Sequence, residues 1–415
     1  MKIALVSQEY PPVTAKGGIG TQTRLKAEGL ARLGHRVYVI SSSPDGEYHE
    51  HTDGRITVIR FPGMEKDIPH MTDAMSWLSH SLLVASVIEK LDAAAGLDII
   101  DFPEWGAEGY AYLLNRNEWH GVTSVIHLHG PLVMFNNIMG WPGTNTPFYK
   151  TGFHMESTAV RLADGIYSSS ACSADWIRKH YDDQRLEIPV IHTGIDLDRF
   201  RPMDVGKEER PTILFAGKIV PNKGVQELVE AACILAVTIP GLRVRFAGRG
   251  NALYLDHLRK IAAEKGCNDM LEFIDFIPTE QMPFELSKAH LFVAPSHYEG
   301  GPGFVYLEAM ACGLPVVACS GSGVSEIVEQ GVNGMLVPPR DSGSLASAMH
   351  GILTNHETLT RMSEEARAYV SRHADANIKI REIEAYYNSV IAARIGNTHI
   401  SEDLQNTSTC KEYSS

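Results

Sequence analysis

The sequence predicts an α/β protein with two tandem domains, each built on a parallel β-sheet. The chain has 415 residues, and single hydrophobic cores stop growing beyond about 250–300 residues, so two domains are expected. Short apolar segments alternate with helical ones, as in parallel sheets that are buried on both faces. This alternation stops at a charged stretch, residues 203–211, and begins again at Thr212.

The first domain opens with a βαβ unit, which implies a parallel sheet with right-handed crossovers. Residues 2–7 are predicted as a strand and residues 36–40 as the next one. The helix between them, residues 21–33, would turn Leu25, Leu30 and Leu33 inward and stop at Gly34. Further strands are expected at residues 56–60, 97–101, 124–128, 165–168 and 190–192. We assign residues 1–205 to this domain and place the linker at residues 203–211.

The second domain repeats the pattern. A strand is expected at residues 212–216, followed by a helix at residues 224–237. More strands are expected at residues 244–248, 271–274, 291–294, 315–318 and 335–337. We assign residues 206–377 to this domain. A helix at residues 378–395 is predicted to pack back onto the first domain, and the polar residues 396–415 are predicted to be a disordered tail.

Composition narrows the function classes. The net charge of −13 argues against a general nucleic-acid binder, which usually has a basic face. Six cysteines without a CxxC pair predict neither a disulfide framework nor a zinc site, and favour a reducing compartment. The sequence begins without a signal-peptide pattern and has no apolar run of spanning length. We therefore expect a cytoplasmic protein, with peripheral contact at the inner face of a membrane and the oligomeric state left open.

The segment Ser296–Gly313 (SHYEGGPGFVYLEAMACG) is the most informative. Its glycines follow a predicted strand and allow backbone N–H groups to crowd around an anion. The helix after Gly303 offers a positive N-terminus to a diphosphate. Glu299 precedes this helix, and Glu308 lies inside it, where a carboxylate can accept hydrogen bonds from a ribose diol. The alternative is an ordinary strand–turn–helix with Glu299 on the surface.

Two lysines lie between a predicted strand and a helix N-terminus. Lys218 and Lys223 would repel each other and the helix dipole unless an anion lies between them. A diphosphate would relieve that repulsion. The alternative is two solvated lysines, which are common.

Two further segments lie at expected strand ends. His127 and His129 are expected to point to opposite faces, so that His129 faces a ligand and His127 lies in the core. Gly17 and Gly18 lie on the first loop between a strand and a helix, where phosphates often bind. Their spacing is not GxGxxG and no GxxxxGK[ST] occurs, so neither a nicotinamide cofactor nor a P-loop is indicated.

Together these segments resemble the retaining glycosyltransferases of family 4, which have the GT-B fold. Residues 299–311 are similar to the family's E-G-F-G-x-x-x-L-E-A-M-A, with eight residues between the two glutamates here instead of seven. Residues 217–224 are similar to its Gly-Arg-x₄-Lys-Gly, with Lys218 in place of arginine. Residues 194–200 are similar to its N-G-V-D-x-x-x-F, with Thr193 in place of asparagine. The resemblance extends to about residue 390.

The resemblance implies a GT-B fold, two facing Rossmann-like domains with a deep interdomain cleft, and a role for each matched residue. The implied catalytic residues are Glu299, His129, Lys218 and Lys223. The implied donor-binding residues are Gly17, Gly18, Lys218, Lys223, Phe276, Ile277, Glu299, Gly300, Gly303, Phe304, Val305 and Glu308. The acceptor is expected near Glu104, Trp105 and Trp141. The family's chemistry retains the anomeric configuration without an obligatory metal.

We therefore expect a glycosyltransferase that uses a UDP-, GDP- or ADP-linked sugar as co-substrate, with neither a metal nor another cofactor. The acceptor would be a saccharide, a lipid-linked saccharide or a small molecule. Two alternatives remain at this point. One is a nucleotide-sugar epimerase or a phosphorylase on the same scaffold, and the other is a non-catalytic nucleotide-sugar binding protein.

Overall fold

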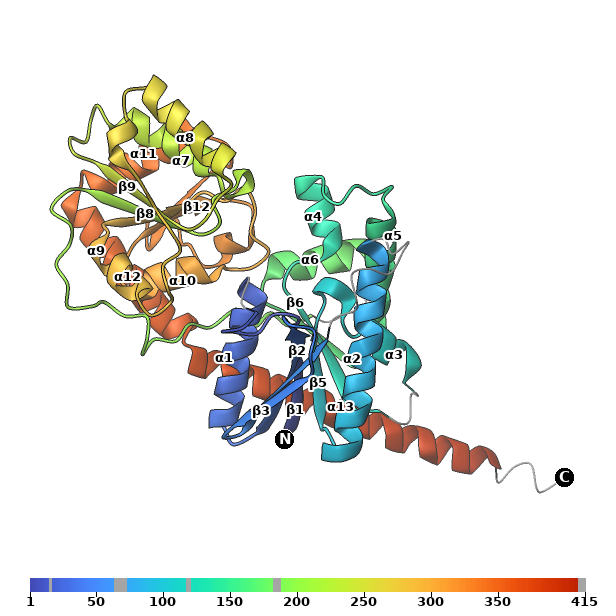
Figure 1. Ribbon diagram of the computed structural model, residues 1–415. Helices are drawn as coiled ribbons and strands as arrows, with labels where there is room; N and C mark the ends of the chain where they lie inside the picture. The colour runs from blue at the N-terminus through green and yellow to red at the C-terminus, as the bar shows by residue number, and fades with distance from the viewer. Residues whose placement is uncertain (15–16, 63–72, 117–120, 182–187, 410–415) are drawn as a thin grey trace. The chain divides into compact units, whose positions relative to one another are not determined.

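The computed structural model describes residues 1–14, 17–62, 73–116, 121–181 and 188–409, and its chain divides into two compact units (Figure 1). Unit 1 comprises Met1–Ser169, Ser173–Ile191 and Ile380–Ser415, and unit 2 comprises Ser170–Cys172 and His192–Lys379. Residues 192–205, which the sequence assigns to the first domain, thus belong to unit 2. The physical reason is that Ile195 and Phe200 are buried in the core of unit 2.

Unit 1 is built on a seven-stranded sheet in the order β3-β4-β2-β1-β5-β6-β7. Only β3 pairs antiparallel with its neighbour, and the other described pairings are parallel. The strands are β1 (Lys2–Val6), β2 (Arg36–Ser43), β3 (His49–Asp53), β4 (Ile56–Pro62), β5 (Ile99–Pro103), β6 (Thr123–Leu128) and β7 (Gly165–Ser168).

Helices cover both faces of this sheet, so its central strands are apolar on both sides. One core cluster contains Ala4, Ile100 and Ile126, and the other contains Ile3, Leu5 and Ile99, as expected for side chains that alternate between the faces of a strand. The helices that begin in this part of the chain are α1 (Gly18–Arg32), α2 (Asp73–Ala95), η1 (Trp105–Ala107), α3 (Tyr110–Asn115), α4 (Leu132–Met139), α5 (Pro147–Leu162) and α6 (Ala171–His180).

Two local features of unit 1 differ from the sequence prediction. Strand β3 was not expected, because its residues are polar and all five are exposed. In helix α1 the predicted Leu30 is buried and Leu33 packs partly buried against the same core, but the helix also turns the polar residues Gln22 and Lys26 inward, which was not predicted. Residues 22, 26 and 30 lie on one helical stripe. Its polar members are paired inside unit 1, because Gln22 Nε2 lies 3.4 Å from His127 Nε2 and Lys26 joins the buried cluster described below.

Unit 2 has a six-stranded parallel sheet in the order β10-β9-β8-β11-β12-β13. Its strands are β8 (Thr212–Ala216), β9 (Arg243–Ala247), β10 (Leu271–Ile274), β11 (Leu291–Ala294), β12 (Val316–Cys319) and β13 (Gly334–Val337). Its helices are η2 (Pro221–Lys223), α7 (Val225–Leu235), α8 (Ala252–Glu264), η3 (Asn268–Met270), α9 (Met282–Lys288), α10 (Phe304–Ala311), η4 (Gly323–Glu326), α11 (Ser342–Leu353) and α12 (His356–His373).

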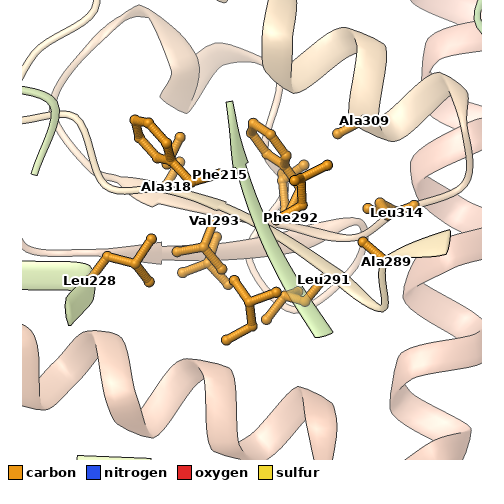
Figure 2. Close-up of a cluster of buried hydrophobic side chains, with 14 of the residues drawn as sticks. Phe215, Leu228, Ala289, Leu291, Phe292, Val293, Ala309, Leu314 and Ala318 are labelled. Carbon is orange, nitrogen blue, oxygen red and sulfur yellow. The ribbon is translucent and has the colours of Figure 1, made fainter. Parts of the chain in front are cut away.

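The core of unit 2 joins the sheet to these helices. Figure 2 shows side chains from β8, β11 and β12 meeting residues from the surrounding helices and loops. Phe215, Phe292 and Leu228 are each at most 1% exposed. This packing holds the carboxyl ends of the central strands in place, and the loops that follow those ends carry the predicted phosphate-binding residues.

Helix α13 (Ala376–Thr409) returns the chain to unit 1. Tyr387 is buried there, and the side chain of Glu384 accepts from His35 at 2.6 Å. The helix extends through Thr409, past residue 396, where the sequence predicts a disordered tail to begin. None of the described helices is long and apolar enough to cross a membrane.

The structure corrects the expectation about disulfides. Cys233 of α7 and Cys267 after α8 are bonded, with their Cα atoms 5.6 Å apart. They are 34 residues apart in sequence, and no short motif marks the pair. Only the packing of α8 beside α7 brings them together.

Candidate functional site

Three loops that follow strands of the unit 2 sheet, those after β8, β9 and β11, are joined by backbone hydrogen bonds. The N–H of His297, after β11, donates to the carbonyl of Asn222, after β8, at 2.9 Å. The N–H of Ile219, after β8, donates to the carbonyl of Arg249, after β9, at 2.8 Å. Since the strands are parallel, these loops all gather at one edge of the sheet, where α/β proteins bind their ligands.

Gly224 shows how closely two of these loops approach. Its φ is +66°, in the left-handed region, and a Cβ atom there would lie 1.9 Å from the carbonyl oxygen of Pro295. Only glycine fits such an approach. The loop of Lys223 and the loop of Glu299 are therefore held against each other by backbone contact.

Lys223 and Glu299, both predicted from the sequence, form an ion pair across this contact. Lys223 Nζ donates to Glu299 Oε1 at 2.5 Å, and the two side chains are 28% and 17% exposed. Lys218, the other predicted cation, is exposed, and within the described parts of the chain it has no ion pair. One lysine is thus already neutralised, while the other faces solvent.

The N-terminus of α10 lies directly after the glycine-rich segment. Gly303 has a φ of +74° and no side chain caps the helix. The N–H groups of Phe304 and Val305 belong to the first turn, where no partner exists within the helix. The segment itself is fixed from outside, because the carbonyl of Glu299 accepts from the N–H of Gly323 at 2.8 Å. Backbone donors are thus held ready beside the Lys223–Glu299 pair.

The second predicted glutamate, Glu308, lies in the same helix. Burial raises the pKa of this carboxyl to about 7, and the positive charge of Arg199 acts in the opposite direction. Arg199 was not predicted as a site residue, although it lies in the segment that resembles N-G-V-D-x-x-x-F. Near neutral pH Glu308 can therefore be present in either protonation state.

The predicted base-binding residues follow β10. Phe276 is 63% exposed, and the guanidinium of Arg249 lies 6.0 Å from its ring centre. Arg249 is held by Asp275 at 2.6 Å. The side chain of Ile277 is buried, so only its backbone can face a ligand. An exposed ring beside a fixed cation is a surface on which a nucleobase can stack.

Unit 1 carries the remaining predicted residues. Gly17 precedes α1 and Gly18 begins it, so both lie at a helix N-terminus as expected for a phosphate loop. His129 follows β6 and is partly buried. Burial lowers its pKa to about 3, with a smaller contribution from the charge of Lys26. The imidazole of His129 is therefore neutral at physiological pH.

The expectation that His127 and His129 point to opposite faces is wrong. Their ring centres are 4.1 Å apart, because residues i and i+2 of a strand lie on the same face. His127 is fully buried and stacks on Tyr167, as a core histidine should. It forms the surface against which His129 rests.

Beneath these histidines lies a buried charged cluster that the sequence analysis missed. Lys26 Nζ donates to Asp101 Oδ2 at 2.7 Å and lies 3.3 Å from His127 Nδ1. The hydroxyls of Tyr167 and Tyr387 donate to the same carboxylate oxygen. A lysine in an amphipathic helix gives no sign in sequence that it will be buried.

Glu104, predicted to contact the acceptor, is 1% exposed. One carboxylate oxygen accepts the N–H groups of His129, at 2.7 Å, and of Gly130. Burial raises its pKa to about 7, against these hydrogen bonds. In this structure Glu104 thus fixes the loop that carries His129, and its contact with an acceptor stays a prediction.

Trp105 and Trp141, the other predicted acceptor residues, belong to one aromatic cluster. Trp105 meets Trp77 edge-on at 5.5 Å, and Trp77 meets Phe148 at 5.0 Å. Phe148 in turn lies 5.8 Å from Trp141, which is 52% exposed. The structure therefore brings both tryptophans into one surface with an exposed end.

The comparisons with known proteins agree with this geometry. The profile described as Glycosyltransferase Family 4 matches residues 16–199, and the profile described as Glycosyl transferases group 1 matches residues 198–369. A glycogen synthase of Mycobacterium tuberculosis is 29% identical over 90% of this chain and 91% of its own length. A D-inositol 3-phosphate glycosyltransferase of Geodermatophilus obscurus is 33% identical over 71% of this chain and 66% of its own length.

Solved structures show the same fold. A sucrose-phosphate synthase of Thermosynechococcus elongatus has a TM-score of 0.80 at 21% identity, covering 94% of this chain and 99% of that one. Anabaena HepE in complex with UDP-glucose has a TM-score of 0.70 at 21% identity, covering 94% and 100%. Nothing in these comparisons favours an epimerase, a phosphorylase or a non-catalytic protein. The chain, with two Rossmann-like domains and a profile match from residue 16 to residue 369, is a family 4 glycosyltransferase of the GT-B type.

Proposed function

We propose that this glycosyltransferase takes a sugar from a UDP-, GDP- or ADP-linked donor and transfers it, with retention of anomeric configuration and without a metal, to a saccharide, lipid-linked or small-molecule acceptor. The observation that carries the proposal is the Lys223–Glu299 pair beside the N-terminus of α10. It combines a cation, free backbone donors and a carboxylate at the ligand-binding edge of a parallel sheet.

Each residue of the donor site has a chemical task in this proposal. The diphosphate is held by Lys218, Lys223 and the first N–H groups of α10. The ribose diol donates to Glu308, and the base stacks on Phe276. When the diphosphate engages the ammonium of Lys223, Glu299 is released to accept from hydroxyls of the transferred sugar. Ligand binding thereby exchanges one ion pair for another.

The reaction breaks the bond between the anomeric carbon and the diphosphate oxygen. The acceptor oxygen then bonds to the anomeric carbon on the same face, and its proton passes to the leaving diphosphate. Negative charge grows on the diphosphate as that bond breaks, so cations and N–H groups fixed in advance stabilise the transition state most. Neutral His129 suits hydrogen bonding to the sugar, since it does not compete for the proton.

The test is turnover with UDP-glucose, GDP-mannose and ADP-glucose in the presence of acceptor mixtures. UDP-glucose comes first because HepE, which shares the fold, is known in complex with it. Thermal shift with UDP, GDP and ADP identifies the base, because a ligand at ~100 times its Kd adds about 2.7 kcal/mol to the stability. NMR of the product then gives the anomeric configuration. An inverted product, or loss of turnover in EDTA that added metal restores, would contradict the proposal.

A further prediction concerns how the affinity for the donor depends on pH. The ribose diol needs the ionised carboxylate of Glu308, whose pKa is raised to about 7. The affinity for UDP-glucose, which does not itself titrate in this range, is expected to rise up to about tenfold from pH 6 to pH 8. Glu308→Gln should remove this rise when binding is measured by calorimetry. A wild-type affinity that is flat across the range would contradict the assignment.

The same carboxyl has the opposite effect on folding. Its folded pKa lies above the ordinary value of 4.5, so its contribution to stability is present below about pH 4.5 and is lost as the pH rises through about 7. Glu308→Gln should therefore flatten the fall in the free energy of unfolding over this window, and denaturant titrations at pH 5 and pH 8 measure it.

A further inference from the structure

A cavity of about 440 Å³ lies in unit 1, outside every residue predicted to bind the donor. Its walls are helix α1, the hairpin of β3 and β4, and the start of the loop between β1 and α1. The volume falls in the range of sites that hold small molecules. None of the site residues predicted from the sequence lines this cavity.

The register of the hairpin decides which side chains face this cavity. His49 lies opposite Arg60, His51 opposite Val58, and Asp53 opposite Ile56. All six line the cavity. Because side chains alternate along a strand, Glu50 and Thr52 lie on the other face of β3. The cavity wall therefore presents two imidazoles, a carboxylate and a guanidinium over an aliphatic floor, and Nε2 of His49 is paired with Asp45 at 2.8 Å, so His51 is the imidazole on which the argument rests.

The surroundings of Arg60 indicate that the cavity binds an anionic ligand. It is 9% exposed, and its guanidinium donates to neutral oxygens only: the carbonyls of Tyr10 and Ser42, and Oγ1 of Thr14. Within the described residues it has no carboxylate partner within 4 Å. Burial lowers its pKa, which reflects the cost of a charge removed from water without a counter-charge. An anionic ligand group would supply that counter-charge.

The opposite wall and the roof suit the rest of a saccharide. Arg24 and Glu28 of α1 form an ion pair at 2.7 Å, both about one-third exposed, and offer donors and acceptors to hydroxyl groups. The roof is formed by residues 10–13, of which Tyr10 is buried and two residues are prolines. This roof is also the beginning of the loop that ends at Gly17 and Gly18.

We propose that this cavity binds an acceptor saccharide that bears an anionic group, a phosphate or a carboxylate. In this proposal Arg60 binds the anionic group, and side chains on the face of β3 form hydrogen bonds with the hydroxyl groups. The proposal rests on the proposed function, since it names the acceptor class of the same enzyme. It also connects acceptor binding to the first predicted phosphate loop, because Arg60 holds the carbonyl of Tyr10 and the hydroxyl of Thr14.

The test is calorimetry on the full chain with glucose 6-phosphate, glucuronate, glucose and inorganic phosphate. The charged sugars are expected to bind at least about tenfold more tightly than glucose, the gain of one charge-assisted hydrogen bond. Glucose 6-phosphate and glucuronate distinguish the two sources of charge. Equal binding of glucose and both charged sugars would overturn the proposal, and so would inorganic phosphate binding as tightly as glucose 6-phosphate.

Two variants on β3, His51→Ala and Glu50→Ala, form a matched pair. His51→Ala removes a cavity side chain and should weaken binding of the charged sugar several-fold, whereas Glu50→Ala, on the opposite face, should leave it unchanged. Arg60→Lys keeps a positive charge but loses the planar fork, and about tenfold weaker binding is expected. Equal effects of His51→Ala and Glu50→Ala would overturn the proposal.

Binding of UDP, GDP and ADP, measured on the same samples, separates this inference from the proposed function. If one of these nucleotides binds and neither charged sugar does, the acceptor inference is overturned while the donor site stands. If all three nucleotides also fail to bind, both fall together. Circular dichroism of Arg60→Lys checks that the loop contacts of Arg60 are not needed for folding, and His51→Ala carries the test if they are.

Discussion

Lys223→Ala is expected to lower turnover with the nucleoside diphosphate sugar by about 10²- to 10³-fold, the scale of one lost transition-state donor. The ammonium lies 2.5 Å from Glu299, so this ion pair fixes its position. Removing it costs the charge that faces the leaving diphosphate and also leaves Glu299 without its partner. Steady-state kinetics with saturating donor measure the loss in kcat.

Two further variants separate these causes. Glu299→Gln breaks the ion pair but keeps the lysine, so UDP binding should be retained while turnover falls. Lys260→Ala, on the exposed face of α8, removes an equal charge from the same unit and should leave turnover unchanged. The role of Lys223 would be refuted if Lys223→Ala and Lys260→Ala gave the same kcat.

Asp101→Ala is expected to destabilise unit 1 by about 3–5 kcal/mol, because it leaves the buried ammonium of Lys26 without its counter-charge. The carboxylate also accepts from Tyr167 and Tyr387, so two hydroxyls lose their acceptor as well. All five tryptophans precede residue 192. Tryptophan fluorescence during urea unfolding therefore reports on unit 1 without interference from unit 2.

Two comparisons make this result specific to the buried charge. Asp175→Ala removes a carboxylate from an exposed pair with Arg178, and a change below about 1 kcal/mol is expected. The double variant Asp101→Ala/Lys26→Met removes both charges and should recover much of the loss. An equal midpoint for Asp101→Ala and Asp175→Ala would contradict the central role of this cluster.

Regular features of the fold could be predicted from sequence where local pattern and tertiary packing agree. Strands β7 and β8 were predicted with the bounds that the structure has, because both are apolar segments ended by turn residues. Strand β3, with its two histidines, resembles a loop by composition, and only its pairing with β4 makes it a strand. An edge strand that is exposed along its whole length, as β3 is, can be polar throughout, and composition then hides it.

The candidate site divides in the same way. Lys223 and Glu299 were predicted from motif spacing, and the structure places them in contact. The burial of Glu104 could not be predicted, since nothing in its neighbours shows that its carboxylate will accept two backbone N–H groups 25 and 26 residues away. The Cys233–Cys267 bond is hidden for the same reason. Long-range partners of single polar residues leave no local periodic signal.

The return of α13 to unit 1 has a consequence for how the protein is made. The strands of unit 1 leave the ribosome early, but Tyr387, which donates to the carboxylate of Asp101, follows about 200 residues later. At about 5–20 residues per second, this delay is roughly 10–40 s. Unit 2, which ends at Lys379, is complete before unit 1. During that interval unit 1 exposes the apolar side chains against which α13 packs, such as Leu30 and Tyr167, and a nascent chain that stalls there presents a surface for chaperones to bind.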